Sequence, residues 1–429
     1  MPRGLGGGEG GALRRPPGRS THGRLRLRDR PVRVAVVGGG PAGLMAAEIL
    51  SASGASVTVY EKMATPGRKL LMAGRGGLNL THSEPIEPFL ARYGAAAGWM
   101  RAILDGFPPS ALIAWAESLG QPTFVGSSGR VFPKALKASP LLRGWLARLE
   151  RQGVELRLRH DWRGWNAAGD LVFRIGDREA VVPRPDATIL ALGGASWPKL
   201  GSTGEWAEVL ARHGIALNRF RPANCGFRIG WSENFRERFA GSPLKPATFS
   251  FGGRAIRGEA MITAYGIEGG AIYALSAALR DAIEASGHAV LTIDLAPDLA
   301  ADRLAAKLDR PSRGQSLSTF LRKAANLSPV AINLLREAQG AALARSSSAL
   351  AAQIKAVPLR LEGTQAIERA ISTAGGIDLA AVDAGLRLRA MADVHVAGEM
   401  LDWEAPTGGY LLQATLATGV AAARAVLLR

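Results

Sequence analysis

The residues with the clearest chemical meaning lie between positions 34 and 43. The apolar run Val34–Val37 is typical of a buried parallel strand, and a glycine-rich turn follows it. In this pattern the first glycine makes a tight turn, the second lets a pyrophosphate approach the backbone, and the third lets a helix pack on the sheet. The helix start, with its free N–H groups, favours phosphate. The candidate contacts are Gly38, Gly40, Pro41, Ala42 and Gly43.

An acidic residue follows at the distance that this pattern requires. Residues 44–52 have helical spacing, residues 56–60 read as a second strand, and Glu61 ends it. A carboxylate at this place accepts hydrogen bonds from the adenosine ribose hydroxyls and repels a 2′-phosphate. Strand, turn, helix, strand and acid are in register, so the sequence predicts a bound FAD or NAD.

A second glycine–acid element near the C-terminus favours FAD. In flavoproteins of the two-dinucleotide-binding-domain type, a late strand ends in such a pair and its acid binds the ribityl chain. The helix that follows then faces the pyrophosphate and the edge of the flavin. NAD-only dehydrogenases do not need this element. The candidate residues are Gly398, Glu399, Asp402, Gly408, Gly409, Tyr410 and Leu411.

Only one complete fingerprint of this kind is visible in the sequence. We therefore expect no stable second nucleotide site. Electrons come either from NAD(P)H that docks transiently or from the substrate itself.

A basic, glycine-rich loop and a third strand–glycine element add further candidates. Lys62, Arg68 and Lys69 either offset cofactor charge or lie in a solvated loop. Asn79 either reaches the isoalloxazine edge or closes a turn. The strand-like run at 187–192 leads into Gly193 and Gly194, repeating the pattern of the first strand.

Three residues are candidate acid–base groups by type: His82, Tyr265 and Glu268. A lone histidine in a loop is more often structural, so the sequence leaves all three open. The single cysteine, Cys225, excludes an internal disulfide, a two-cysteine redox relay and a cysteine-rich metal site, and we expect no metal.

The elements that must position these residues define an α/β fold. We expect a discontinuous, Rossmann-like FAD domain of the two-dinucleotide-binding-domain type, because both ends of the chain carry cofactor motifs. Short strand-like runs in the middle predict a small β domain that carries a helical insert. The expected boundaries are 31–205 and 371–429 for the FAD domain, 206–299 and 353–370 for the β domain, and 300–352 for the insert.

The chain of 429 residues has a formal net charge of +17. Residues 1–30 hold eight arginines and two acids and read as a disordered basic tail without a secretory signal. The remaining charge is scattered arginine, which favours compositional bias over nucleic-acid binding. No uninterrupted apolar stretch reaches membrane-spanning length, so we expect a cytoplasmic protein without a transmembrane segment.

Three long segments resemble one family. They are GRKLLMAGRGGLNLTH at 67–82, GGASWPKLGSTG at 193–204 and GEMLDWEAPTGGYLLQ at 398–413. They are similar to motifs of the BaiN/YhiN-like NAD(P)/FAD-dependent oxidoreductases, and the resemblance runs from about Arg33 to the C-terminus. It implies a split FAD domain that carries a β-barrel and a helical insert. It also favours cofactor contact for Arg68 and Lys69.

Two departures from the family pattern fall where a substrate could bind. The family's loop cysteine is Leu78 here, and its "THxGxSGP" segment is TAYGIEGG at 263–270. The substrate of any relative therefore does not carry over. The sequence predicts an FAD-dependent oxidoreductase that acts on a small organic substrate by flavin hydride transfer. The alternatives are a flavin-dependent RNA-modifying enzyme and a non-catalytic redox carrier or sensor.

Overall fold

The computed structural model describes residues 30–309 and 314–428. The predicted tail, apart from Arg30, and residues 310–313 of the predicted insert lie outside the described residues.

A five-stranded parallel sheet joins the two ends of the chain. Its order is β20-β10-β1-β2-β6, with both β2 and β10 paired to β1. Because β20 pairs with β10 at Thr188 and Val394, a C-terminal strand completes the N-terminal sheet. This confirms the expected α/β Rossmann-like class. The bounds are Arg33–Val37 (β1), Ser56–Glu61 (β2), Glu155–Leu158 (β6), Ala187–Leu190 (β10) and Val394–Val396 (β20).

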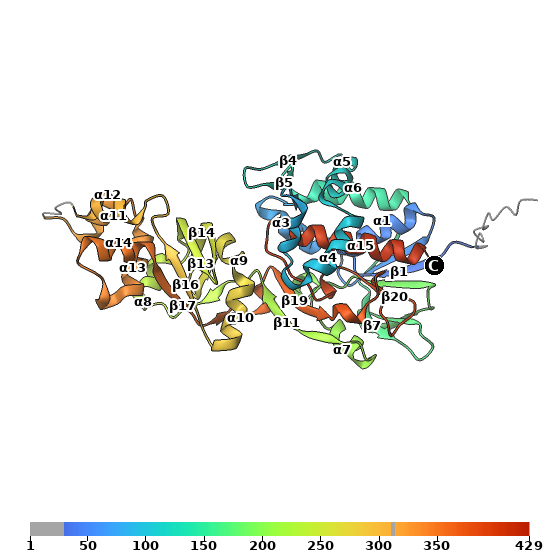
Figure 1. The fold of residues 1–429 in the computed structure, drawn as a ribbon. Helices are drawn as coiled ribbons and strands as arrows, with labels where there is room; N and C mark the ends of the chain where they lie inside the picture. The colour runs from blue at the N-terminus through green and yellow to red at the C-terminus, as the bar shows by residue number, and fades with distance from the viewer. Residues whose placement is uncertain (1–29, 310–313, 429) are drawn as a thin grey trace, which may run out of the picture. The chain divides into compact units, whose positions relative to one another are not determined.

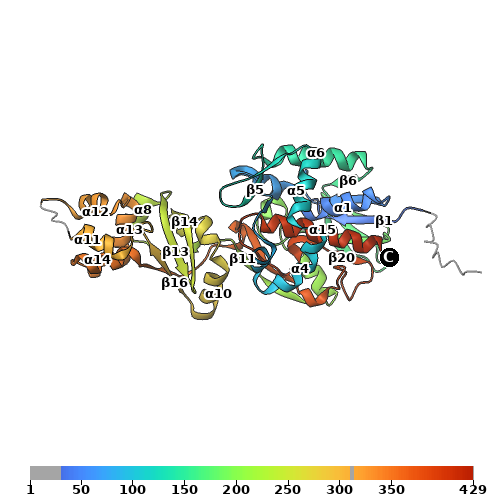
Figure 2. The same cartoon turned by 45° about the horizontal axis from the view of Figure 1, so that its top comes forward.

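The first and last helices, α1 (Pro41–Ala52) and α15 (Tyr410–Leu427), lie side by side on this sheet (Figures 1 and 2). The two helices approach so closely that a Cβ on Gly419 would lie 2.4 Å from the carbonyl oxygen of Ala42. The contact therefore requires a glycine at this position. By length and hydropathy α15 could cross a membrane, yet 61% of it is buried within the protein. Such burial is what a core helix shows.

Between β2 and β6 the chain forms helices and one hairpin, and of these the sequence failed to reveal the hairpin. The helices are α2 (Arg68–Ala73), α3 (Ile86–Ala91), α4 (Ala97–Gly106), α5 (Pro109–Ser118) and α6 (Ala138–Arg151). The hairpin pairs β4 (Thr123–Val125) with β5 (Arg130–Pro133), and β3 (Thr81–His82) joins β5 from the other side. A second antiparallel sheet contains β7 (Asp161–Trp165), β8 (Leu171–Ile175) and β9 (Arg178–Val182).

The middle of the chain forms a seven-stranded antiparallel sheet that is nearly a barrel. Its order is β17-β16-β13-β14-β15-β12-β18. The two edge strands follow each other in sequence and are separated only by Glu362, so the sheet curls toward closure. The bounds are Phe227–Arg228 (β12), Pro243–Phe251 (β13), Arg254–Thr263 (β14), Gly266–Glu268 (β15), Ala289–Asp294 (β16), Val357–Leu361 (β17) and Gly363–Thr364 (β18).

In the described chain between 301 and 355, helices gather beside this sheet (Figure 1). Segment 300–352 is called the helical unit below, and its last helix runs three residues beyond it. The helices are α11 (Ala301–Leu308), α12 (Leu317–Ala325), α13 (Pro329–Gln339) and α14 (Ser347–Lys355). Ser328 caps α13, because its hydroxyl accepts from Ala331 N.

Two hydrophobic cores divide the described chain. One runs from Val34 to Ile215 and resumes at Ile377, and the other lies between Cys225 and Ala370. The remaining elements are β11 (Leu217–Ala223), β19 (Ser372–Ile377), α7 (Trp206–Arg212), α8 (Glu233–Phe239), α9 (Gly270–Tyr273) and α10 (Ser276–Ser286). The domain boundaries near 205 and 370 stay a prediction.

Candidate functional site

The glycines of the β1–α1 turn have different surroundings. Gly38 has φ 111°, and a Cβ there would lie 2.2 Å from Ala191 O. A Cβ on Gly43 would lie 1.9 Å from Gly38 O, whereas a Cβ on Gly40 would meet nothing within 4 Å. The turn and the helix packing therefore exclude side chains at Gly38 and Gly43. Gly40 instead faces open space, where a ligand can approach the backbone.

The N-terminus of α1 is available to an anion. Gly40 is the N-cap and makes no side-chain capping hydrogen bond, Pro41 occupies the first turn, and that turn has no acidic residue. The first N–H groups of a helix lack intrahelical partners, and the dipole adds a partial positive charge. This end of α1 can therefore hold a pyrophosphate.

The Glu61 carboxylate is fixed at the end of β2. Its Oε2 accepts from Gly39 N at 2.7 Å, and its Oε1 accepts from Met63 N at 2.7 Å. Burial raises the pKa of this carboxyl, and the two backbone hydrogen bonds oppose the rise. A carboxylate held in this way retains lone pairs for the hydroxyls of a ribose.

Glu399 is the centre of a second polar cluster. It accepts from Lys69 Nζ at 2.8 Å and from Thr373 N at 2.8 Å. Lys69 also donates to Ser196 Oγ, and Gly194 N lies 3.3 Å from Glu399 Oε2. Residues more than 300 positions apart thus meet here, so the acid of the late motif and the base of the early loop form one unit.

One cavity of about 530 Å³ joins both clusters. This volume is within the usual range for sites of small ligands and cofactors. The predicted residues that line it are Gly38, Gly40, Pro41, Ala42, Glu61, Lys62, Arg68, Lys69, Asn79, Gly193, Gly398, Glu399, Gly408, Gly409 and Leu411.

Four predicted contacts do not line the cavity. Gly43 packs against Gly38, and Gly194 lies beside Glu399. Asp402 accepts from Gly375 N and Asn218 Nδ2, so it fixes the β11–β19 region. The Tyr410 hydroxyl donates to Glu84. These four residues contact other parts of the protein next to the cavity and do not form its wall.

Three buried polar atoms of the cavity lining have no hydrogen-bond partner within the described part of the chain. They are Arg68 Nε, Asn79 Oδ1 and Trp162 Nε1. An unsatisfied buried polar group is costly, and in native proteins such groups usually meet a water or a ligand. Two unpaired donors and one unpaired acceptor thus line the same cavity as a helix N-terminus that can hold a pyrophosphate. This set suits a dinucleotide with polar ring systems and a ribityl chain. The residues present therefore fit FAD.

The three candidate acid–base residues lie outside the cavity lining. His82 accepts from Glu84 N through Nδ1 and contacts Ser128 O through Nε2, so both ring nitrogens have local partners. The Tyr265 hydroxyl donates to Glu268, and both burial and that carboxylate raise the tyrosine pKa. Tyr265 and Glu268 pack against Gly226. The structure brings this pair together but not onto the cavity wall.

Sequence reasoning missed two residues that matter for the site. Trp162 is not among the candidates that the sequence offers, yet it lines the cavity and its buried Nε1 has no partner among the described residues. Asn224 is buried with φ 52°, and its amide bonds Ser372 Oγ, Ala405 O and Thr407 N. An asparagine between a strand and a cysteine gives no signal in sequence. Its role depends on segments about 150 and 180 residues away.

The single cysteine of the chain does not line this cavity. Cys225 is buried, and burial raises its pKa to about 12, so its thiol stays protonated. Within residues 30–309 and 314–428, no group of three potential ligands could hold a metal ion.

The profile of the HI0933-like protein Rossmann domain matches residues 32–425. The chain belongs to this family. The family and the cofactor geometry make it an FAD-dependent oxidoreductase.

Three individual similarities stand beside the family. A 3-dehydro-bile acid Δ4,6-reductase of Clostridium scindens is 26% identical over 92% of this chain and 98% of its own. A ribosomal RNA dihydrouridine synthase of Haemophilus influenzae is 25% identical over 56% of this chain and 60% of its own. The solved 3-ketosteroid Δ1-dehydrogenase of Sterolibacterium denitrificans is 12% identical with a TM-score of 0.50, covering 93% and 100% of the two chains. The last similarity concerns the fold alone.

Proposed function

We propose that this enzyme reduces a carbon–carbon double bond conjugated to a carbonyl in a small organic substrate, with NADH or NADPH docking transiently as the electron donor. The observation on which this proposal depends is that the α1 N-terminus, Glu61 and Glu399 all line the same cavity. Support for the bond type comes from the two named relatives. A Δ4,6-reductase and a dihydrouridine synthase both saturate a conjugated double bond.

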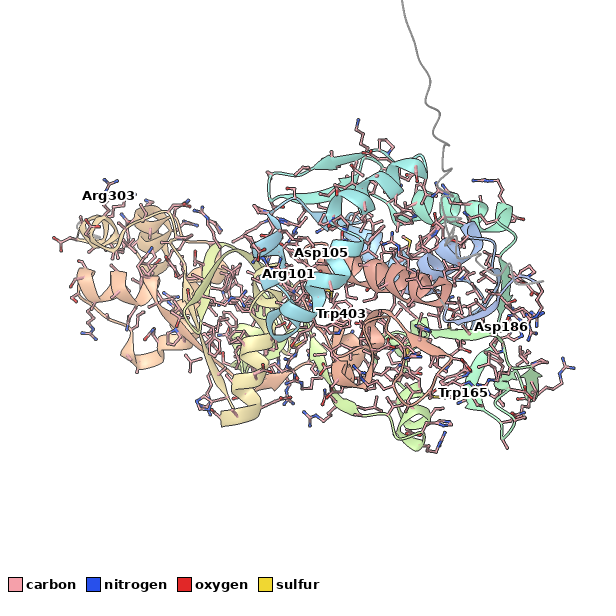
Figure 3. The ribbon with its side chains drawn as sticks, turned by 45° about the vertical axis from the view of Figure 1, so that its right-hand side comes forward. Arg101, Asp105, Trp165, Asp186, Arg303 and Trp403 are labelled. Carbon is pink, nitrogen blue, oxygen red and sulfur yellow. The ribbon has the colours of Figure 1, made fainter. Side chains whose placement is uncertain are left out.

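Different residues of the cavity would hold different parts of FAD. The α1 N-terminus would hold the pyrophosphate, and Glu61 the adenosine ribose. Glu399, supported by Lys69, would hold the ribityl chain. When bound, FAD supplies the hydride chemistry. Trp403, labelled in Figure 3, is fixed by its Nε1–H donation to Gly398 O. It would surround the ring and exclude water together with the remaining lining residues Met72, Ala73, Gly77, Leu78, Asn79, Ile371, Ser372, Thr407, Gly408, Gly409 and Leu411.

The test is an anaerobic titration of the purified holoenzyme with NADH and then NADPH, followed by visible absorption. Bleaching of the flavin band, followed by recovery when a conjugated enone is added, supports the proposal. A matched saturated ketone is the control and should give no recovery. A band that neither nicotinamide bleaches would contradict the proposed donor. If reduced flavin persists with every enone tried, the proposed bond type is wrong.

A second candidate function is the reduction of a base in RNA, which also contains a double bond conjugated to a carbonyl. The named dihydrouridine synthase favours it, as does the high net charge. It predicts that RNA, but not a free enone, reoxidises the reduced flavin. A redox carrier or sensor would instead hold FAD and turn over neither substrate.

A further inference from the structure

The helical unit carries an excess of positive charge that its own acids do not neutralise. Segment 300–352 contains eight arginines and lysines and three acids, a net charge of +5. Two of the acids are already engaged: Asp309 accepts from Ser347 Oγ, and Glu337 accepts from Ser232. The charge of this unit is therefore available to a partner.

Five of these cations are exposed and make no ion pair with any described residue: Arg303, Lys307, Arg322, Lys323 and Arg345. Most cations near the cavity are different, because Lys62 and Lys69 each pair with a carboxylate. Unpaired cations can neutralise an external anion without first giving up a partner.

The fold places these cations on adjoining elements. Arg303 and Lys307 are one turn apart on α11 and both are exposed, whereas Leu304 and Leu308 of the same helix are buried. α11 packs against both α12, whose last turn carries Arg322 and Lys323, and α14. The side chain of Arg303 points away from the neighbouring helices (Figure 3). The cations thus form a multi-helix surface.

The surface has the chemistry of a phosphate-backbone partner rather than of a membrane. None of the exposed large hydrophobic side chains of the described chain lies in segment 300–352. A helix that lies on a lipid surface needs apolar side chains to insert. A polynucleotide needs only cations at spaced positions, because phosphate contacts supply affinity and orientation without reading bases.

We propose that the helical unit is an RNA-docking surface that binds the phosphate backbone through Arg303, Lys307, Arg322, Lys323 and Arg345. The proposal rests on the second candidate function, reduction of an RNA base. The surface positions RNA without sequence preference, because its aromatic side chain, Phe320, is half-buried and unavailable for base stacking.

The test is fluorescence anisotropy of a labelled, uridine-containing RNA hairpin with the full-length holoenzyme across a salt series. The variant is Arg303→Gln with Lys307→Gln. The matched control is Arg178→Gln with Arg212→Gln. These two cations lie on β9 and α7, outside the helical unit, are exposed, and also lack ion pairs with described residues. Net charge falls equally in both variants.

We expect the helical-unit variant to weaken RNA binding at least about fivefold near 0.15 M salt. It should also reduce the magnitude of the log–log salt slope by about 1.4. The control should stay within about twofold of the parent. Equal weakening in both variants would show a diffuse charge effect and overturn the proposal.

Two further binding measurements, with duplex DNA and with phosphatidylserine vesicles, identify the class of partner. Binding of duplex DNA of equal length as tightly as RNA, or binding of phosphatidylserine vesicles in place of RNA, overturns the RNA assignment. Flavin absorption and NAD(P)H bleaching are recorded for every variant. RNA docking without RNA-dependent reoxidation leaves the docking surface intact and removes the second candidate function. If the parent enzyme does not bind the RNA hairpin but still reduces an enone, the docking proposal is overturned and the proposed enone reduction is unaffected.

Discussion

At the residue scale, the site depends on groups whose neighbours dictate their chemistry. Glu61 is a strand-end acid held by two backbone N–H groups and raised in pKa by burial. Gly43 and Gly40 belong to one motif yet face a carbonyl oxygen and open space respectively. Identical residue types in one short motif therefore respond differently to substitution.

The raised pKa of Glu61 predicts a pH-dependent affinity for FAD. A ribose hydroxyl donates to the carboxylate but gains less from the neutral acid. Affinity should therefore fall on acidification, starting above pH 4.5. We expect Glu61→Gln to bind FAD about tenfold more weakly at neutral pH and to lose most of this dependence. Fluorescence titration of the apoprotein between pH 5 and 8 measures both effects.

The raised pKa of Glu61 also predicts how the free energy of unfolding depends on pH. Burial favours the neutral acid in the folded state, so the folded apoprotein binds more protons than the unfolded chain above pH 4.5. The contribution of Glu61 to the free energy of unfolding is therefore largest at low pH and declines as pH rises through the folded pKa. A pH series of urea melts that shows the opposite difference between parent and Glu61→Gln would refute this.

The β1–α1 glycines give a paired prediction. Gly43→Ala places a Cβ against Gly38 O and should destabilise the protein by about 3 kcal/mol, with loss of FAD. Gly40→Ala meets no protein atom within 4 Å, so the apoprotein should keep its melting temperature while FAD affinity falls. Denaturant melts of both apoproteins test the contrast. Equal destabilisation would mean that Gly40 also serves packing.

At the element scale, the inserted segments are tied to the cavity wall by buried polar contacts. The fully buried Arg280 of α10 binds Glu404 through both terminal nitrogens, at 2.9 and 2.7 Å, and also contacts Asp281. Asn224 holds the same 403–407 segment. These contacts connect α10 and Asn224 to the segment 403–407, which contains the cavity-lining residues Trp403 and Thr407.

Removing one partner of this ion pair should loosen that connection. Glu404→Ala leaves Arg280 with the partly exposed Asp281 as its ion-pair partner and with the Pro222 carbonyl, and we expect a loss of about 2 kcal/mol in the free energy of unfolding. Flavin fluorescence should also rise as the 403–407 segment admits water. The exposed pair Arg101–Glu87 is the control, because Glu87→Ala should change stability by less than about 1 kcal/mol.

At the scale of the whole molecule, FAD joins segments from both ends of the chain. The lining combines residues 37–79 with residues 397–415, so folding and cofactor binding are coupled. Removal of FAD should lower the apparent stability, and FAD at about 100 times its dissociation constant should restore about 2.7 kcal/mol. Melts of apo- and holoprotein across FAD concentrations test this. A melting temperature that is independent of FAD would contradict the assigned site.

Much of this architecture is local enough to be visible in sequence. The β1–α1–β2 unit and the strand β10 depend on short-range periodicity and on small residues, and the structure confirms both. The hairpin at 123–133 was missed because its strands have three and four residues, too short to show an alternating pattern. The near-closure of the barrel depends on edge strands meeting at Glu362, which no local pattern reveals.

The sequence by itself determined the cofactor class and the family, because the glycine–acid motifs report local requirements of turns, helix ends and phosphate contact. Only the tertiary structure decided which of those residues face the cavity. It turned Asp402 and Tyr410 toward protein partners, joined Lys69 to Glu399, and exposed the need of Trp162 and Asn79 for a ligand. Pairing between residues hundreds of positions apart is set by packing of the whole chain, and local sequence does not encode it.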